Sequence, residues 1–241
     1  MTVFVALILA VAADAPSWPQ FRGPGGTGIA APTENPPVEF GIGKRMLWKT
    51  EIPSGHSSPA VWGNRIFLST FDKATEKLEI LALDRGTGTI LWRRPIPAKE
   101  IEAVHEISSP ATATPAVDSE TVYAYFGSYG MIAFDHEGHE RWTLPLPLVK
   151  VQYGSGTSPI LAGDFIILSR DEGEVPHLLA VNRKTGTVAW KVPQYVDFPG
   201  RPFNSSTPVV WRSAIVIHHR SEIVGFDVAT GARNWFIKIT T

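Results

Sequence analysis

The residues that could perform acid–base or metal chemistry are seven histidines and a few carboxylates. His218 and His219 are adjacent on an expected strand, so their side chains point to opposite faces and cannot both ligate one ion. His136 and His139 flank a short turn, where solvated polar residues are common. Three carboxylates could contact a cation, but no spacing singles them out: Glu102, Glu106 and Asp171. Without a Gly-x-Ser-x-Gly elbow, a phosphate loop or a His-Glu-x-x-His motif, the sequence predicts no catalytic residues and no metal site.

Polar and aromatic residues also gather in four short segments, each of which directly precedes an apolar stretch. Such side chains bind ligands by hydrogen bonding and stacking. The candidate binding residues are His56, Ser57, His105, Glu106, Gln152, Tyr153, Arg201 and Asn204. Whether these residues meet depends on the elements that position them.

Those elements are four internal repeats, which span residues 58–92, 114–142, 158–190 and 207–235. Their closing tryptophans are 50, 48 and 45 residues apart, the spacing of β-propeller blades. Each repeat opens with Ser/Thr-Pro and contains short Val-, Ile-, Phe- and Tyr-rich stretches between turn residues, so it predicts four strands. No repeat has a sustained helical period. The expected fold is therefore an all-β propeller of four-stranded antiparallel blades, with very little helix.

The turn before each closing tryptophan is the most specific part of the repeat. Asp or Asn can hydrogen-bond the backbone two residues on, and the following Gly can adopt positive φ, so the turn specifies a hairpin. The tryptophan then falls at one position in each blade, where we expect it to act as a wedge between neighbouring blades. The expected docking residues are Trp48, Trp92, Trp142, Trp190 and Trp235, with Gly88, Gly186 and Gly231.

The pattern Ala-x-Asp-x-x-Thr-Gly-x-x-x-Trp resembles the repeat of pyrroloquinoline-quinone (PQQ)-like propellers, the quinoprotein and BamB-like family. The opening WPQFRGPGGTG, Trp18 to Gly28, resembles a group of exported proteins with the same repeat. The resemblance implies a ring of seven or eight blades, of which this chain supplies four. A WD40 repeat is disfavoured because no Trp-Asp dipeptide recurs.

The resemblance also raises the question of catalysis. Quinoprotein dehydrogenases hold PQQ over a Ca²⁺ ion in the channel, with an Asp as base, and stack it between a Trp and a disulfide of adjacent cysteines. This chain has no cysteine, and Asp84, Asp135 and Asp227 lie in turns. We therefore expect a non-catalytic binding or scaffold module, similar to BamB of the outer-membrane barrel-assembly machinery, with PQQ and Ca²⁺ suggested only by family analogy. The alternative is a fragment or remnant of a PQQ-dependent oxidoreductase.

Residues 45–50 form a fifth Trp-containing stretch, expected as an orphan outer strand before the first blade. We expect a signal peptide at 1–13, an extended segment at 14–44 and repeats at 45–241, with blades at about 55–95, 108–147, 155–193 and 204–241. Three interpretations of the blade number stay open. The sequence is an N-terminal fragment, or two copies close an eight-blade ring as a homodimer, or four blades close alone.

The composition indicates which partners are disfavoured, and the N-terminal residues indicate in which compartment the protein is expected. A net charge of −1 provides no basic surface for nucleic acid. The apolar run from Val3 to Ala13 is shorter than the roughly 20 residues of a membrane span and fits a signal peptide, which predicts a periplasmic or extracytoplasmic protein. A buried first strand is the alternative. In a propeller the segments that enter the inner strands gather around one mouth of the central channel. Two roles for these segments stay open. Their Ser and Thr residues cap the strands and the other side chains are solvated, or the mouth binds a protein, peptide, glycan or small ligand.

Overall fold

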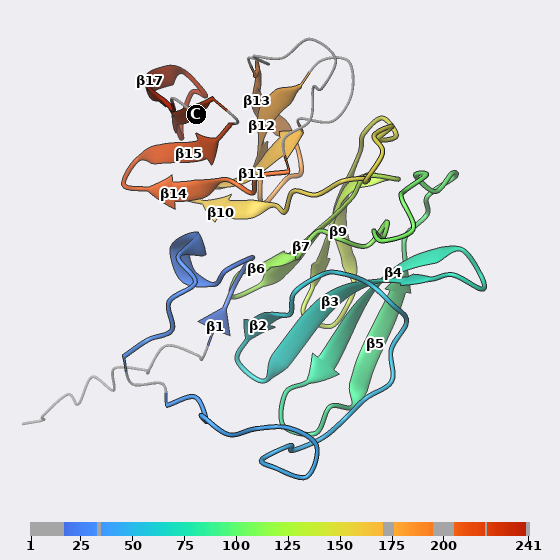
Figure 1. The fold of residues 1–241 in the computed structure, drawn as a ribbon. Helices are drawn as coiled ribbons and strands as arrows, with labels where there is room; N and C mark the ends of the chain where they lie inside the picture. The colour runs from blue at the N-terminus through green and yellow to red at the C-terminus, as the bar shows by residue number, and fades with distance from the viewer. Residues whose placement is uncertain (1–16, 33–34, 171–175, 195–204, 220, 240–241) are drawn as a thin grey trace, which may run out of the picture.

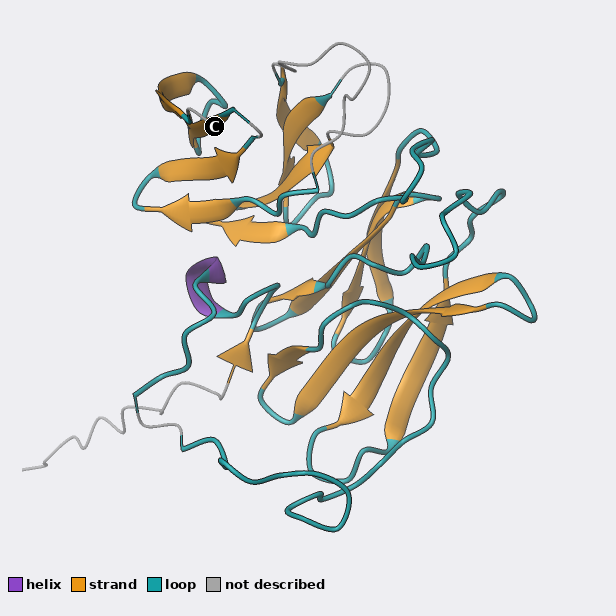
Figure 2. Cartoon of the chain, viewed as in Figure 1, coloured by secondary structure: helices purple, strands orange, loops and turns teal. Residues whose placement is uncertain are grey.

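A computed structural model describes residues 17–32, 35–170, 176–194, 205–219 and 221–239. The expected signal peptide, residues 1–13, lies outside the described residues. Within them the chain is almost entirely strand and loop, with one short 3₁₀ turn, η1 (Pro24–Gly26), as Figure 2 shows. The expectation of very little helix is confirmed.

Four antiparallel sheets follow one another along the chain, each with its strands in sequence order. Blade one contains β2 (Ala60–Trp62), β3 (Arg65–Asp72), β4 (Lys77–Asp84) and β5 (Ile90–Pro95). Blade two contains β6 (Ala116–Val117), β7 (Thr121–Phe126), β8 (Gly130–Asp135) and β9 (Glu140–Pro145). Blade three contains β10 (Ile160–Ala162), β11 (Phe165–Arg170), β12 (His177–Asn182) and β13 (Val188–Pro193). Blade four contains β14 (Val209–Trp211), β15 (Ala214–His218), β16 (Glu222–Asp227) and β17 (Arg233–Lys238).

The hydrophobic core consists of three clusters, one between each pair of consecutive blades. Strand β7 is continuously apolar or aromatic from Val122 to Phe126 rather than alternating, because all six of its residues are buried. Val122 and Ala124 belong to the cluster with blade one, whereas Tyr123 and Tyr125 belong to the cluster with blade three. Successive side chains of a strand point to opposite faces, so a blade that is covered on both faces needs apolar residues at every position.

The tryptophans that close the first three repeats cross to the next blade. The indole Nε1 of Trp92 donates to His136 O at 2.8 Å, and that of Trp142 donates to Arg183 O at 2.9 Å. Trp190 donates in the same way to Val228 O at 3.1 Å. The indole of Trp142 also lies over Gly186 of the next turn, where an added Cβ would be 2.6 Å from the ring.

The short turn of blade two receives Trp92 at Gly138, a residue that the repeat pattern did not identify because this copy lacks one residue. Opposite each tryptophan on the neighbouring strand stands a small residue, Ala82, Ala133, Ala180 or Gly225. A register shift follows that residue in every blade.

The expectation of an orphan strand at residues 45–50 is wrong in one respect, since these residues form no strand pairing. No described strand lies beside them to exchange backbone hydrogen bonds. Trp48 nevertheless takes the docking position on blade one, where its Nε1 donates to Arg85 O at 2.9 Å and its ring covers Gly88. The Trp48 side chain therefore docks on blade one although it does not lie on a strand, whereas the docking tryptophans of the other blades lie on their outer strands.

The inner strands β2, β6, β10 and β14 face one another, and β1 (Ser17–Trp18) and η1 lie among them (Figure 1). Strand β1 pairs antiparallel with β2 and so extends the sheet of blade one to five strands. The sequence analysis expected residues 14–44 to be an extended segment and did not predict this pairing.

Candidate functional site

The segments that enter the inner strands are joined by a ladder of hydrogen bonds. The Ser58 amide donates to Thr114 Oγ1 at 3.0 Å, and the Thr114 amide donates to Ser158 Oγ at 3.0 Å. The Ser158 amide then donates to Thr207 Oγ1 at 3.1 Å. The Ser/Thr that opens the second, third and fourth repeats therefore accepts from the preceding blade. This role could have been suspected from the hydroxyl residue that recurs in every repeat.

Beside this ladder, a cleft of about 480 Å³ separates the mouth segments of blades one and two. Three candidate binding residues line it together: His56, His105 and Glu106. Polar neighbours from both segments complete the wall, namely Ser54, Lys73, Glu102, Ser108 and Ser109. The cleft therefore presents imidazole, ammonium, carboxylate and hydroxyl groups within one space.

Two further candidates, Gln152 and Tyr153, extend this cleft towards blade three. The His105 amide donates to Gln152 O at 2.8 Å, and the rings of His105 and Tyr153 are 5.3 Å apart. Ser108 Oγ donates to Tyr153 O at 2.7 Å. Tyr153 remains 42% exposed and the neighbouring Ile107 70% exposed. We call these residues and the cleft, His56, His105–Ser109 and Gln152–Tyr153, the rim site.

Ser57, the remaining candidate among the described residues, does not extend the rim site. Ser57 Oγ accepts from the Ser69 amide at 3.2 Å and donates to Ser58 O at 2.9 Å, so its hydroxyl ties the mouth segment to β3. Arg201 and Asn204 lie outside the described residues, as does the carboxylate Asp171.

Glu102 is a buried carboxylate at the floor of the cleft, 2% exposed. Its Oε2 accepts from the Ser155 amide at 3.1 Å, and its own amide donates to Ser128 Oγ at 3.0 Å. A Cβ at Gly127 would lie 2.6 Å from this carboxylate, so only glycine leaves room for it. Glu102 thus links segments of blades two and three beneath the rim site, a role that its sequence context did not reveal.

Two histidines outside the rim site, His136 and His139, have structural surroundings. His136 Nε2 lies 2.9 Å from Asp118 O and its ring is 5.4 Å from that of Phe67. Burial lowers the pKa of His136 below its usual value, which favours the neutral ring. His139 Nδ1 lies 2.9 Å from Asp135 Oδ2 in the turn of blade two.

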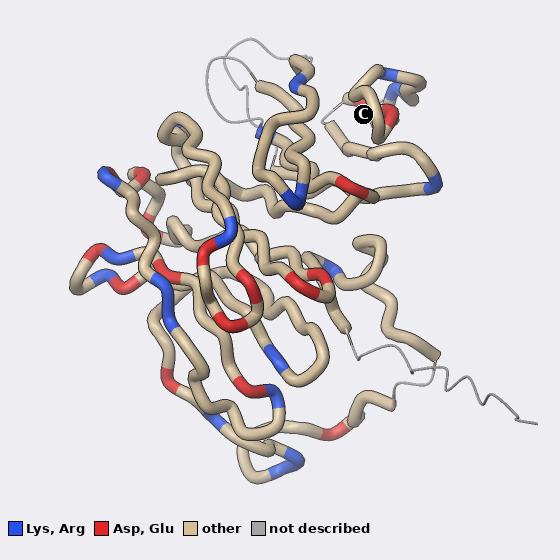
Figure 3. The backbone as a smooth tube through the Cα atoms, turned by 180° about the vertical axis from the view of Figure 1, so that it is seen from behind, with Lys and Arg blue, Asp and Glu red and all other residues tan. Residues whose placement is uncertain are grey.

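The carboxylates and histidines in the described part of the chain are dispersed. Among those residues, His, Asp and Glu nowhere gather in groups of three or more that could hold a metal ion. The carboxylates Asp84 and Asp227 accept hydrogen bonds from their own turns. Figure 3 shows Lys and Arg interspersed with Asp and Glu along the chain.

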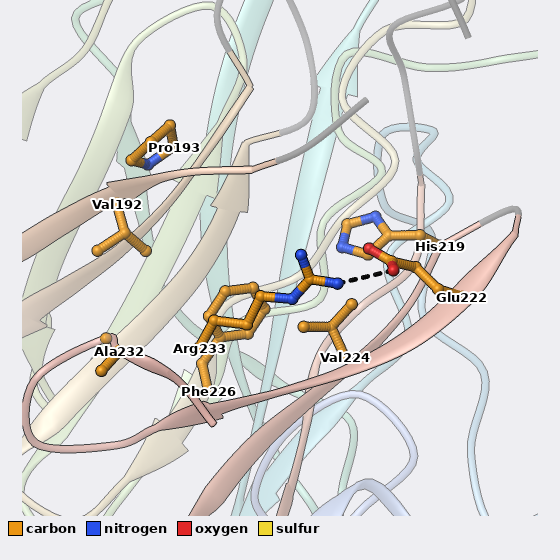
Figure 4. A pocket seen from close by; sticks show the side chains of 9 residues that line it. Val192, Pro193, His219, Glu222, Val224, Phe226, Ala232 and Arg233 are labelled. Atoms are coloured by element: carbon orange, nitrogen blue, oxygen red, sulfur yellow. Dashed lines mark hydrogen bonds and ion pairs between the residues drawn. The ribbon is translucent and has the colours of Figure 1, made fainter. Parts of the chain in front are cut away.

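A second, smaller groove lies between blades three and four (Figure 4). Val192 and Pro193 of β13 form one side, and Phe226 and Arg233 belong to the other. Arg233 donates to Glu222 Oε2 at 2.7 Å, so its charge is balanced within the groove. Because both partners of this ion pair belong to blade four, it occupies the charged groups on that side of the groove, and the facing residues Val192 and Pro193 are apolar.

A family model described as outer membrane protein assembly factor BamB matches residues 43–241. Among curated proteins, none matches the chain. No helix among the described residues has the length and apolarity to cross a membrane.

Three solved structures show the same fold. BamB from Moraxella catarrhalis is 20% identical with a TM-score of 0.56, over 81% of this chain and 56% of that one. Quinohemoprotein alcohol dehydrogenase from Comamonas testosteroni is 15% identical, TM-score 0.55, over 77% of this chain and 35% of that one. A europium-containing methanol dehydrogenase is 15% identical with a TM-score of 0.57, over 81% of this chain and 44% of that one. The chain thus spans about half or less of the length of these structures.

Proposed function

Because the chain belongs to the BamB family of PQQ-like β-propeller repeat proteins, we propose that it is a non-catalytic module that binds an extended peptide of a partner protein at the rim site. The observation that carries this proposal is the tilted ring contact between His105, which lines the cleft, and the exposed Tyr153. Exposed aromatic side chains next to hydrogen-bonding groups are the usual anchors of protein recognition.

The rim site has the composition that peptide binding requires. Tyr153 and Ile107 offer apolar surface for a side chain of the partner. His56, Lys73 and Glu106 offer donors and acceptors along the cleft for its backbone. Hydrogen bonds from His105 and Ser108 to the segment 152–153 hold these groups in place, so little ordering is needed on binding.

A selection with a library of random dodecapeptides tests this proposal. The purified chain is used for enrichment, and the enriched peptides are measured against two variants. Tyr153→Ala is expected to weaken binding at least about tenfold, as truncation of an aromatic anchor does. Trp211→Ala, a 56% exposed tryptophan on blade four, is the matched control and should leave affinity unchanged. Equal affinity for the two variants would contradict the proposal.

The alternative is a fragment or remnant of a PQQ-dependent oxidoreductase. It is supported by the shared fold of the two dehydrogenases, at an identity of 15%. The discriminating experiment adds PQQ and Ca²⁺ to the purified chain and follows quinone absorbance and dye reduction with an alcohol. Saturable quinone binding with turnover would favour the oxidoreductase, whereas unbound quinone and no turnover favour the binding module.

We also propose that the protein is exported by a signal peptide at residues 1–13. The apolar run from Val3 to Ala13 supports this proposal. N-terminal sequencing of the protein recovered from the periplasmic fraction tests it. A mature N-terminus near Asp14 is expected, and an intact Met1 in the cytoplasm would contradict export.

A further inference from the structure

The segment from Ser17 to Gly26 contacts the inner side of all four blades, in the order of the chain. Trp18 pairs with Val61 on β2 of blade one. Pro19 O accepts a hydrogen bond from the Val117 amide on β6 of blade two at 2.7 Å. Successive residues of one short segment therefore meet successive blades.

Gln20 continues the series to blade three. Its side-chain Oε1 accepts from the Leu161 amide on β10 at 2.8 Å, although 141 residues separate the two in sequence. Gln20 is only 3% exposed, and a buried amide side chain is stable only when it is hydrogen-bonded. Blade four is met by η1, since a Cβ at Gly26 would lie 2.9 Å from Val209 Cγ1.

The three contact positions on the blades are equivalent in the repeat. Val61, Val117 and Leu161 each stand three residues after the Ser/Thr of the opening Ser/Thr-Pro. At the inner edge of a blade this residue has no fifth strand of its own repeat to pair with. Such an unpaired strand edge is an acceptor for an extended segment.

The segment is shaped for this place by its own turn. The Gly23 amide donates to Gln20 O at 2.8 Å, which reverses the chain directly after Gln20. Gly23 has φ +71°, and a Cβ there would lie 2.6 Å from the Trp18 indole, so the ring packs on the glycine backbone. In Figure 1 β1 and η1 accordingly lie among β2, β6, β10 and β14, rather than along the outside of a blade.

We propose that the inner edges of the four blades form one strand-acceptor site, and that its resident occupant is the chain's own segment, residues 17–28. The segment acts as an intramolecular peptide ligand that joins the blades at the axis. An extended peptide with the same Trp-Pro-Gln sequence competes with it. This site is separate from the rim site and does not depend on the proposed function.

A cut in the full chain tests whether the segment is a bound ligand. Residues 29–32 are exposed, so a protease site inserted there can be cleaved with the segment in place. After cleavage, the N-terminal piece is expected to co-elute with the blades in size-exclusion chromatography under native conditions. An excess of a synthetic peptide of residues 15–29 should displace it. Co-elution that resists this peptide, or release of the piece from blades that stay folded, would overturn the proposal.

Hydrogen exchange of the uncut chain provides a second test that does not require the cut form to stay folded. In Gln20→Ala the Leu161 amide loses its acceptor and is expected to exchange at least about tenfold faster, while the Val117 amide, bonded to Pro19 O, stays protected. Thr27→Ala, at an exposed residue of the same segment, is the matched control. Unchanged exchange at Leu161 in Gln20→Ala would overturn the proposal.

Discussion

The hydroxyl oxygen of Thr114 accepts a hydrogen bond from the backbone amide of Ser58 at 3.0 Å, across the boundary between blades one and two. The amide of Thr114 in turn donates to Ser158 in blade three. A single buried threonine thereby connects three blades at the mouth, beside the rim site. Because the mouth segments of different blades are fixed to one another, residues from several repeats can form one binding surface.

Thr114→Val should weaken this connection. The replacement keeps the side-chain shape but removes the acceptor of the Ser58 amide, so we expect a loss of about 1–3 kcal/mol of unfolding free energy and faster exchange of that amide. Thr114→Ser keeps the hydroxyl, as Ser158 does at the equivalent position, and should keep the amide protected. Urea denaturation and hydrogen exchange measure both. Equal exchange of the Ser58 amide in the two variants would contradict the ladder.

Removal of a docking tryptophan should destabilise the chain strongly. Trp142 is 8% exposed, fills the space between blades two and three, and donates to Arg183 O. Trp142→Ala is expected to lower the unfolding free energy by about 3–5 kcal/mol, because it leaves a cavity and an unpaired carbonyl. Trp211→Ala serves as the exposed control, with an expected change within about 0.5 kcal/mol. Similar urea midpoints for the two variants would refute the wedge role.

The glycine beneath Trp142 offers a separate prediction about steric fit. Gly186 and Gly163 both have positive φ, +72° and +59°, but only a Cβ at Gly186 would meet a ring, that of Trp142. Gly163→Ala should therefore show only the backbone strain, about 1 kcal/mol. Gly186→Ala should cost at least about 1 kcal/mol more, because the indole must move. Thermal unfolding compares the two variants, and equal shifts would show that the indole does not rest on Gly186.

Acid should destabilise the turns that precede the tryptophans. Hydrogen bonds from the Thr87 amide and hydroxyl hold the pKa of Asp84 below its usual value of 3.8. The unfolded chain therefore binds this proton first, so the contribution is present above about pH 4 and is lost as pH falls through the folded pKa.

Asp84→Asn tests this dependence, because Asn182 already occupies the same turn position in blade three and accepts the same kind of bond. The variant cannot titrate there, so its stability should fall less than that of the parent between pH 6 and pH 3. The measurement is the urea midpoint at each pH. An identical decrease in both proteins would exclude Asp84 as a contributor.

The sequence predicted the blades because their signals are local. The turn from Asp84 to Gly88 and the tryptophan after it lie within a few residues of one another, and an equivalent turn and tryptophan recur in each repeat. The same pattern predicted a shared mouth for the segments that precede the inner strands, and three residues of these segments, His56, His105 and Glu106, line one cleft.

The axial segment could not be predicted in the same way. Its contacts use a backbone carbonyl of Pro19 and a side-chain amide of Gln20, which carry no hydrophobic period. The partner of Gln20 is 141 residues away, beyond the reach of any local pattern. The strand prediction for residues 45–50 was wrong for a different reason. These residues have the local sequence pattern of a strand, but no described strand lies beside them to pair with.

The most direct test of the proposed function is a hydrogen-exchange comparison of the chain with and without a saturating enriched dodecapeptide. The account predicts slower exchange at residues 105–109 and 152–155, the two segments that the His105–Gln152 and Ser108–Tyr153 hydrogen bonds join. Residues 222–233, at the groove between blades three and four, should be unaffected. Protection of that groove with no change at the rim site would contradict the account.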